Sequence, residues 1–316
     1  MAYAVAAFYH FAPVPDPASV QGPLRRICGR AGVKGTLLVA PEGVNGTIAG
    51  ARAGIDAVLA HVRALPGFAT LEHRESTARV PPFLRMKVRL KREIVTMGRP
   101  DVDPTAAARC YVEAGDWNAL VDDPGVVLID TRNFYETEIG TFDGAIDPGI
   151  ETFGQFPAWW AENAVRFAGK KVAMFCTGGI RCEKSAGYLI MHGAQVCHLK
   201  GGILKYLEHV PQADSRWRGS CFVFDRRVSV GHGLAAGPHM LCHGCRRPIL
   251  PADARRPEYE HGVSCHHCAG TVGAARKARF RERQRQICIS QGCGGRVPPD
   301  PCGHNDYLHQ PAQGTS

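Results

Sequence analysis

The sequence has 316 residues, of which 45% are hydrophobic, so it is long enough to bury two or three cores. It contains no apolar run that could span a membrane, and its first residues lack the basic and apolar segments of a signal peptide. We therefore expect a cytoplasmic protein without a membrane partner. Thirteen cysteines, an odd number concentrated after residue 175, favour thiol chemistry and metal binding over a disulfide framework.

The net charge of +9 is unevenly distributed along the chain. Residues 1–98 carry 13 Lys/Arg and 6 Asp/Glu, residues 99–170 carry 5 and 13, and residues 171–316 carry 20 and 10. Two basic regions flank an acidic one, which favours a polyanionic partner such as a nucleic acid. A chance distribution is the alternative.

Residues 1–98 are predicted to form a ferredoxin-like α+β domain. The pattern indicates a strand at 2–10, a helix at 23–30, strands at 33–40 and 45–49, and a helix whose apolar face spans 55–62. A last strand at 84–91 completes the order β-α-β-β-α-β.

That last strand alternates apolar and basic residues. The apolar positions, Leu84, Met86, Val88 and Leu90, are expected to pack on helices. The other face presents four cations: Arg85, Lys87, Arg89 and Lys91. Their repeat of about 6.6 Å can follow a phosphate backbone, which predicts RNA binding. A solvated face neutralised by Glu72 and Glu75 is the alternative.

Residues 99–218 are predicted to form an α/β domain with a parallel sheet. A linker at 98–104 leads to a helix at 104–121 and a buried strand at 126–129, which ends in Asp130-Thr131-Arg132. A covering helix at 157–167 contains two tryptophans, which we interpret as packing residues rather than a base-stacking platform. Later elements are a helix at 182–192 and a strand at 195–199.

The segment Cys176–Arg181 follows the apolar run 172–175 and predicts a strand, a tight loop and a helix that begins near Cys182. The backbone N–H groups of residues 177–181 and the positive helix end are expected to converge on the Cys176 sulfur. Arg181 adds a fixed positive charge at the mouth of the loop. This arrangement stabilises a thiolate or a persulfide. A buried structural cysteine is the alternative.

The size of this loop also carries information. Four residues separate Cys176 from Arg181, and they are Thr177, Gly178, Gly179 and Ile180. Phosphatases with a cysteine nucleophile have a longer loop, because theirs must encircle a tetrahedral phosphate. A smaller ring suits a single added sulfur or the edge of a flat base. The loop and its flanking motifs resemble the rhodanese family.

Residues 219–273 are predicted to form a small zinc module. Two Cys-x2-Cys pairs, 19 residues apart, supply the ligands Cys242, Cys245, Cys265 and Cys268. Four thiolates leave no open position, so the zinc is expected to be structural. Free thiols in a degraded site are the alternative. Cys288, Cys293 and Cys302 are too scattered to assign.

Residues 274–316 are predicted to form a basic, largely disordered tail. Its polybasic run contains Arg276, Lys277, Arg279 and Arg281, for which we prefer RNA contact over a merely solvated role. The charges of this run would spread around a helix, so it is not a membrane-type amphipath.

Five segments together resemble the tRNA uridine-34 5-hydroxylases, bacterial proteins built on a rhodanese domain. These segments are residues 40–48, 136–142, 175–184, 200–203 and 222–227, within a resemblance that covers about residues 3–270. The resemblance implies oxygen-dependent conversion of the wobble uridine of tRNA to 5-hydroxyuridine. It also implies that the essential cysteine is Cys176, that the anticodon loop is the partner and that molecular oxygen is a co-substrate. Thr131 departs from the valine of the family.

The sequence shows no flavin, iron or haem motif and no sign of DNA as a partner. Our hypothesis is that Cys176 adds to C6 of the uracil and makes C5 nucleophilic; a persulfide on Cys176 is the second possibility. Cys182 could resolve an oxidised Cys176 as a disulfide, or could be a buried helix position. Two other classes stay open. One is a sulfurtransferase that passes a persulfide sulfur to a thiol, and the other is an RNA-binding adaptor with a vestigial rhodanese domain.

Overall fold

The computed structural model describes residues 2–105 and 111–290. Contacts divide the chain into two compact units. The first comprises Met1–Thr137 and Thr141–Arg218, and the second comprises Glu138–Gly140 and the chain from Gly219 onward. Within the described residues, no helix is long and apolar enough to cross a membrane.

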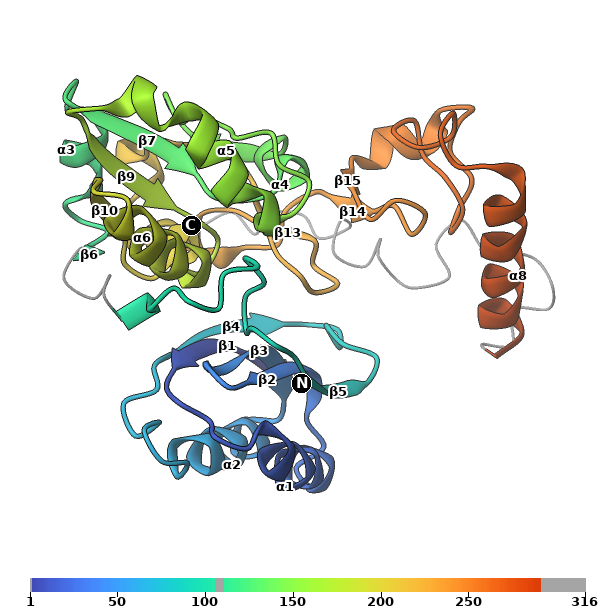
Figure 1. Cartoon of the computed structure of the whole chain (residues 1–316). Coiled ribbons are helices and arrows are strands. Elements are labelled where there is room, and N and C mark those ends of the chain that lie inside the picture. The colour runs from blue at the N-terminus through green and yellow to red at the C-terminus, as the bar shows by residue number, and fades with distance from the viewer. Residues whose placement is uncertain (1, 106–110, 291–316) are drawn as a thin grey trace, which may run out of the picture. The chain divides into compact units, whose positions relative to one another are not determined.

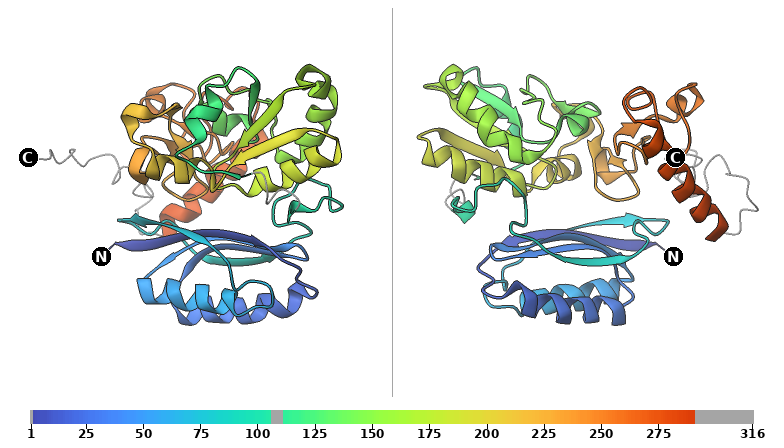
Figure 2. Two further views of the ribbon diagram at one scale, coloured as in Figure 1. Left: turned by 90° about the vertical axis from the view of Figure 1, so that its left-hand side faces the viewer. Right: turned by 45° about the vertical axis from the view of Figure 1, so that its right-hand side comes forward.

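The N-terminal domain is one sheet covered on one face by two helices (Figures 1 and 2). Its elements are β1 (Tyr3–Phe11), α1 (Pro17–Arg30), β2 (Lys34–Ala40), β3 (Gly43–Gly50), α2 (Arg52–Arg63), β4 (His73–Ala78) and β5 (Met86–Leu90). The strand order is β4-β1-β3-β2-β5, with β2 and β5 parallel and the other pairs antiparallel. Apolar residues of α2 at helical spacing, among them Ile55, Leu59 and Val62, pack with Phe8 and Ile48 of the sheet. The predicted α+β class is confirmed.

The last predicted strand, 84–91, is present as β5, but the pattern missed another strand before it, so the predicted order β-α-β-β-α-β lacks one strand. The polar segment His73–Ala78 forms β4 beside β1, whereas the basic segment forms a fifth strand, β5, at the opposite edge. β4 carries no apolar alternation, which is why the pattern missed it. In β5, Met86 and Val88 pack on the core, but Leu84 is 72% exposed and Leu90 44% exposed. The expected four-residue apolar face is therefore only half formed.

Helix α1 begins at Pro17, six residues before the predicted start. Asp16 caps it, because its side chain accepts a hydrogen bond of 3.0 Å from the Ala18 N–H. Proline at the first helical position is also favourable, since its missing N–H would have had no helical partner there.

The second domain is a parallel four-stranded sheet with order β6-β10-β9-β7, as the predicted class requires. Its strands are β6 (Tyr111–Val112), β7 (Val126–Asp130), β9 (Lys171–Phe175) and β10 (Gln195–Leu199). Its other elements are α3 (Trp117–Val121), α4 (Phe134–Thr137), β8 (Gly140–Phe142), α5 (Phe156–Asn163), α6 (Ile180–Met191) and α7 (Gly202–His209). β9 is an inner strand of this sheet. The residue that follows β9 therefore lies at the carboxyl edge of the middle of the sheet, which is where ligands bind in α/β sheets.

One helix prediction in this domain is wrong, and the covering helix predicted at 157–167 is present but ends in a 3₁₀ turn. The helix expected at 104–121 is replaced by strand β6 and the short helix α3, while residues 106–110 lie outside the described residues. Strand pairing with β10 outweighs the local helical pattern at Tyr111 and Val112. The covering helix is α5, followed by a 3₁₀ turn at Ala164–Phe167. Trp160 is buried and stacks on Phe167, in agreement with a packing role.

The second unit is built from short antiparallel ribbons and one long helix. Its elements are β12 (Cys221–Phe222) paired with β13 (Ser229–Val230), β14 (Met240–Leu241) paired with β15 (Pro248–Ile249), and α8 (Ala274–Ser290). The strand β11 (Trp217–Gly219) precedes them. The small core around the four knuckle cysteines contains only Met240 and Ile249 as buried aliphatic residues. Such a core is too small to be stable without a metal or another cross-link.

Candidate active site and metal centre

Cys176 lies between the end of β9 and the start of α6. The helix begins at Ile180, two residues before the predicted start, and its N-cap Gly179 has a φ of +104°. The Gly179 N–H donates to the Cys176 Sγ over 3.1 Å, and the Cys182 N–H is a second backbone donor. The sequence predicted that the N–H groups of residues 177–181 would all point at the sulfur. Of these residues Gly179 donates to it, and the other backbone donor, Cys182, lies just beyond the predicted range.

The N-terminus of α7 holds the backbone of the same loop. The N–H groups of Ile203 and Leu204 donate to the carbonyl oxygens of Cys176 and Thr177 over 2.9 and 3.1 Å. A Cβ on Gly202, whose φ is +68°, would lie 2.4 Å from the Cys176 carbonyl oxygen. Only glycine fits there, which explains the glycine turn after β10.

The Cys176 thiol is fully buried, and opposing effects act on its pKa. Burial raises the pKa, but a hydrogen bond from the Cys182 thiol, the charge of Arg181 and the two backbone N–H groups outweigh it. The net result is a pKa below the ordinary thiol value, so the site favours a thiolate. This is the electrostatic outcome that the loop motif predicted.

Arg181 supplies the fixed positive charge that the sequence predicted, and its side chain is 8% exposed and paired. Its Nη1 and Nη2 donate to the Glu136 Oε1 and Oε2 over 2.6 and 2.8 Å. Burial disfavours the charged Glu136, yet Arg181 and Arg132 outweigh burial and hold its pKa below the usual range. Glu136 thus fixes the cation that lowers the Cys176 pKa. The sequence analysis included Glu136 in the segment 136–142 that resembles the hydroxylases, but it predicted no role for this residue.

Cys182 lies in the first turn of α6, fully buried beside Cys176. Burial and the neighbouring Cys176 thiolate raise its pKa well above the ordinary value, so Cys182 is the protonated partner of the pair. The Thr131 Oγ1 lies 3.5 Å from the Cys182 Sγ. The threonine that stands here in place of the valine of the family therefore makes a polar contact at the site. The three predicted catalytic residues, Cys176, Arg181 and Cys182, are therefore brought together. Both cysteines are free thiols.

The sequence did not predict a cluster that joins the N-terminal domain to α6. The Tyr9 and Tyr111 hydroxyls both donate to the Glu183 Oε1, over 2.7 and 2.8 Å. The fully buried Lys184 Nζ lies 2.6 Å from the Glu42 Oε2 and 3.1 Å from the Glu93 Oε2. The sequence offered one signal for this contact: the segment 40–48 contains the acidic Glu42, and the segment 175–184 contains the basic Lys184.

The basic strand and the basic helix, both predicted to bind RNA, lie in different compact units. Lys87 and Arg89 share the face of the sheet opposite to Met86 and Val88, and the exposed Arg85 and Lys91 flank β5. Glu75 pairs with Arg52 on β4's side of the sheet. Because β4 and β5 are four strand spacings apart, about 19 Å, neither Glu72 nor Glu75 can neutralise these cations.

The basic run forms α8, and several of its cationic side chains contact other groups of the second unit. Arg281 pairs with Glu260, and the Lys277 Nζ donates to the Ala269 carbonyl oxygen over 2.7 Å. Arg276 lies over the Phe280 ring. Arg279 forms no ion pair within residues 2–105 and 111–290. Cys288 is buried on the same helix, whereas Cys293 and Cys302 lie outside the described residues.

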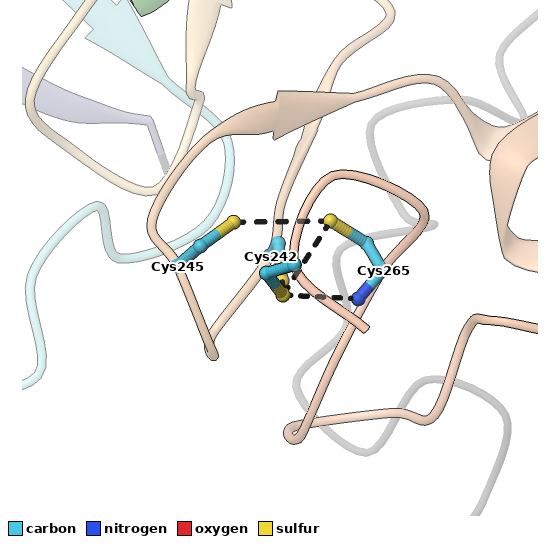
Figure 3. Close-up of side chains that lie close together, drawn as sticks. Cys242, Cys245 and Cys265 are labelled. Atoms are coloured by element: carbon cyan, nitrogen blue, oxygen red, sulfur yellow. Dashed lines mark hydrogen bonds between the residues drawn. The ribbon is translucent and has the colours of Figure 1, made fainter. Parts of the chain in front are cut away.

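The four predicted zinc ligands form one cluster, and Figure 3 shows three of them, Cys242, Cys245 and Cys265. The sulfur atoms of Cys242, Cys245, Cys265 and Cys268 all lie within 4.8 Å of one another. The separations Cys242–Cys268, Cys245–Cys265 and Cys265–Cys268 are 3.9, 3.8 and 4.0 Å. Four sulfurs at 2.3 Å from a tetrahedral zinc would be about 3.8 Å apart, so the cluster fits this ion. These separations are far too long for disulfide bonds.

Comparison with known proteins gives two domain matches. Residues 3–94 match the UPF0176 acylphosphatase like domain, and residues 113–209 match the rhodanese-like domain. The chain is 64% identical to the tRNA uridine(34) hydroxylase of Ruegeria pomeroyi, over 92% of this chain and 97% of that protein. It is 56% identical to that of Caulobacter vibrioides, over 92% and 95%.

Solved structures resemble single domains. A rhodanese-related protein from Thermoplasma volcanium is 21% identical, with a TM-score of 0.26, and covers 32% of this chain and 93% of its own. An acylphosphatase from Coxiella burnetii is 12% identical, with a TM-score of 0.22, and covers 28% and 93%.

Proposed function

Because the chain belongs to the tRNA uridine(34) hydroxylase family, we propose that it hydroxylates C5 of the wobble uridine of tRNA, with Cys176 as nucleophile and dioxygen as co-substrate. The observation that supports the proposal is the buried Cys176, whose loop favours the thiolate form. This thiolate lies in a chain that is 64% identical to a protein named tRNA uridine(34) hydroxylase. The anticodon loop is the expected docking site on the tRNA, since its unpaired bases can be splayed out to reach a buried thiolate.

In the first step, the Cys176 thiolate adds to C6 of the uracil, and the electron pair of the C5–C6 double bond moves to C5. The Gly179 and Cys182 N–H groups and Arg181 hold the thiolate ready, and Glu136 keeps Arg181 in place. Carbon 5 then becomes the nucleophile that meets oxygen.

The oxidation needs two electrons beyond those of the C–H bond. We assign them to the Cys176–Cys182 dithiol. Addition of C5 to dioxygen gives a C5 hydroperoxide, and the Cys182 thiol takes its outer oxygen, which breaks the O–O bond and leaves the C5 hydroxyl and a Cys182 sulfenic acid. After Cys176 leaves C6, its thiolate attacks the Cys182 sulfur, so that water departs and the Cys176–Cys182 disulfide forms. One uridine, one dioxygen and two thiols then give one 5-hydroxyuridine, one water and one disulfide. An external thiol restores the pair. Zinc held by Cys242, Cys245, Cys265 and Cys268 would supply structure to the second unit, since four thiolates leave no open position for substrate.

The test uses purified full-length protein, tRNA lacking the modification, a thiol reductant and ¹⁸O-labelled dioxygen. Mass spectrometry of the nucleosides should show one ¹⁸O atom at C5 of the wobble uridine. Cys176→Ser should abolish the product while melting temperature and tRNA affinity stay unchanged. Cys197→Ser is the matched control, because Cys197 is an equally buried thiol on β10. Cys110, a second candidate control, lies outside the described residues.

Two results would contradict the proposal. Label that enters from water instead of dioxygen would exclude the oxygenation. Rapid turnover of thiosulfate with a thiol acceptor, without need of tRNA or oxygen, would instead identify a rhodanese-type sulfurtransferase.

A further inference from the structure

Glu183 is a carboxylic acid beside Cys176 for which the steps above assign no task. It lies in the first turn of α6 and is partly buried. Its Oε1 accepts hydrogen bonds from the Tyr9 and Tyr111 hydroxyls over 2.7 and 2.8 Å. No Lys or Arg of the described chain pairs with it, in contrast to Glu136 and its partner Arg181. No paired cation therefore holds the Glu183 carboxyl group in its charged form, as Arg181 holds Glu136.

The carboxyl group is connected to the nucleophile through a short series of contacts. The Tyr9 hydroxyl lies against the Cys176 loop, because a Cβ built on Gly179 would be 2.7 Å from it. The Gly179 N–H is the group that donates to the Cys176 Sγ. Burial and the nearby Cys176 thiolate raise the pKa of Glu183, while the two tyrosine hydrogen bonds act in the opposite direction.

We propose that Glu183 donates a proton to C5 of the uracil and removes one from it, and that Tyr9 and Tyr111 are positioning residues for this carboxyl group. The inference rests on the proposed function and adds its acid–base group. When the Cys176 thiolate adds to C6, the electron pair that moves to C5 takes the proton of the Glu183 carboxyl group. In the reverse step the carboxylate removes a C5 hydrogen and the thiolate leaves C6.

The same proton removal completes hydroxylation. Once C5 carries oxygen, it still carries its original hydrogen, which must leave as a proton for the C5–C6 double bond to return. The electrons of that C–H bond re-form the double bond as the Cys176 sulfur departs from C6. No additional oxidant or reductant is required for this step, so it can be studied without oxygen.

The experiment therefore measures hydrogen exchange at C5 in the absence of oxygen. Reduced full-length protein is incubated with tRNA in D₂O, and deuterium at C5 of the wobble uridine is measured by mass spectrometry. The wild type should introduce deuterium. Glu183→Gln keeps an oxygen acceptor for both tyrosines but has no acidic proton, so exchange should fall by about 10²–10⁴-fold. Glu162→Gln, the same change at an exposed residue on α5, should exchange like the wild type.

Exchange by Glu183→Gln at the wild-type rate would overturn the proposal. So would a wild type that inserts ¹⁸O at C5 yet exchanges no hydrogen there, and this outcome would leave the proposed function intact. A wild type that neither oxygenates nor exchanges would overturn both. Glu183→Gln should keep the melting temperature and tRNA affinity of the wild type. This result would show that the variant loses the acidic proton and not the contact of Glu183 with Tyr9 and Tyr111.

The two tyrosines are tested by a pH profile, which a merely structural role would not shift. The titratable groups that act on Glu183 include Tyr9 on β1, Tyr111 on β6, Cys176 in the loop and, further away, Glu72. The charged Arg74 on β4 interacts with Tyr9 and is present in both the wild type and Tyr9→Phe. Tyr9→Phe removes a hydrogen bond that lowers the Glu183 pKa, so that pKa should rise. The alkaline limit of the exchange rate should then move to higher pH. A Tyr9→Phe profile identical to that of the wild type would contradict the positioning role.

Discussion

Cys176 shows how single hydrogen bonds decide the state of a buried thiol. Burial without donors raises a thiol pKa, and Cys28, buried in the N-terminal core, illustrates this with a pKa raised to about 11. Cys176 is buried to the same extent but receives two backbone N–H groups, a thiol and the field of Arg181. Its pKa is shifted in the opposite direction, below the ordinary value. The surroundings, rather than the exposure, therefore select the reactive cysteine.

This contrast predicts the pH dependence of alkylation. The rate of iodoacetamide labelling at Cys176 should reach half its maximum below the ordinary thiol pKa of about 8.5, because only the thiolate reacts. Cys28 should stay unlabelled over the same range. Arg181→Gln removes the cation and leaves Glu136 unpaired, so the Cys176 profile should move to higher pH. Peptide mass spectrometry over a pH series measures all three. Equal profiles for Cys176 and Cys28 would contradict the prediction.

Lys184 is a second residue whose effect should be large. Its fully buried ammonium group is held between Glu42 and Glu93. Lys184→Met leaves two carboxylates without their cation, which should lower the free energy of unfolding by about 3–5 kcal/mol. Urea denaturation measures the change, and Lys170→Met, at an exposed position of the same domain, is the control. A Lys184→Met midpoint within the error of the control would show that the pair contributes nothing.

At the scale of elements, the sequence predicted best where local chemistry and burial agree. An apolar run followed by Cys-x4-Arg with two glycines allows few structures, so β9, the loop and α6 were predicted almost to the residue. β4 is polar and is held in place by its pairing with β1, which no local pattern reveals. The Tyr9–Glu183 contact joins residues 174 positions apart. Such a contact depends on domain packing and was therefore absent from the prediction.

β5 gives the prediction for RNA affinity. Changing Arg85, Lys87, Arg89 and Lys91 to Gln should weaken tRNA binding and lower the salt slope by up to about 3, near 0.7 for each phosphate that is no longer neutralised. Changing Arg25, Arg26 and Arg30 to Gln on α1 should have little effect, because α1 lies on the other face of the sheet. Filter binding over a salt series measures the slope. An unchanged slope would direct attention to Arg276 and Arg279 on α8.

At the scale of the whole molecule, the two compact units are stabilised in different ways. The first unit has extensive apolar cores, around Leu37 and Ile48 in one domain and around Ile129 and Met174 in the other. The second unit has ribbons of two-residue strands, and the core around its four cysteines has Met240 and Ile249 as its buried aliphatic residues. We therefore expect this part of the unit to depend on the four cysteines and the metal that they are able to bind.

α8 depends on the same centre. Arg281 pairs with Glu260, the Arg283 Nη2 donates to the Gly262 carbonyl oxygen over 2.7 Å, and Lys277 reaches the Ala269 carbonyl oxygen. All three partners lie in or beside the loop that carries Cys265 and Cys268. Loss of the metal should consequently release the basic helix as well as the knuckles.

Zinc removal should therefore unfold one unit and spare the other. Purified protein should contain about one zinc per chain, and a strong chelator under reducing conditions should remove it. Hydrogen–deuterium exchange should then show loss of protection at residues 240–268 and in α8, while β9 and α6 keep theirs. Cys245→Ser should reproduce this pattern without chelator, and Cys221→Ser, at a buried thiol outside the cluster, should not. Protein without zinc, or a chelated protein whose α8 stays protected, would contradict the prediction, because the ion pairs and small core alone would then suffice to hold the second unit together.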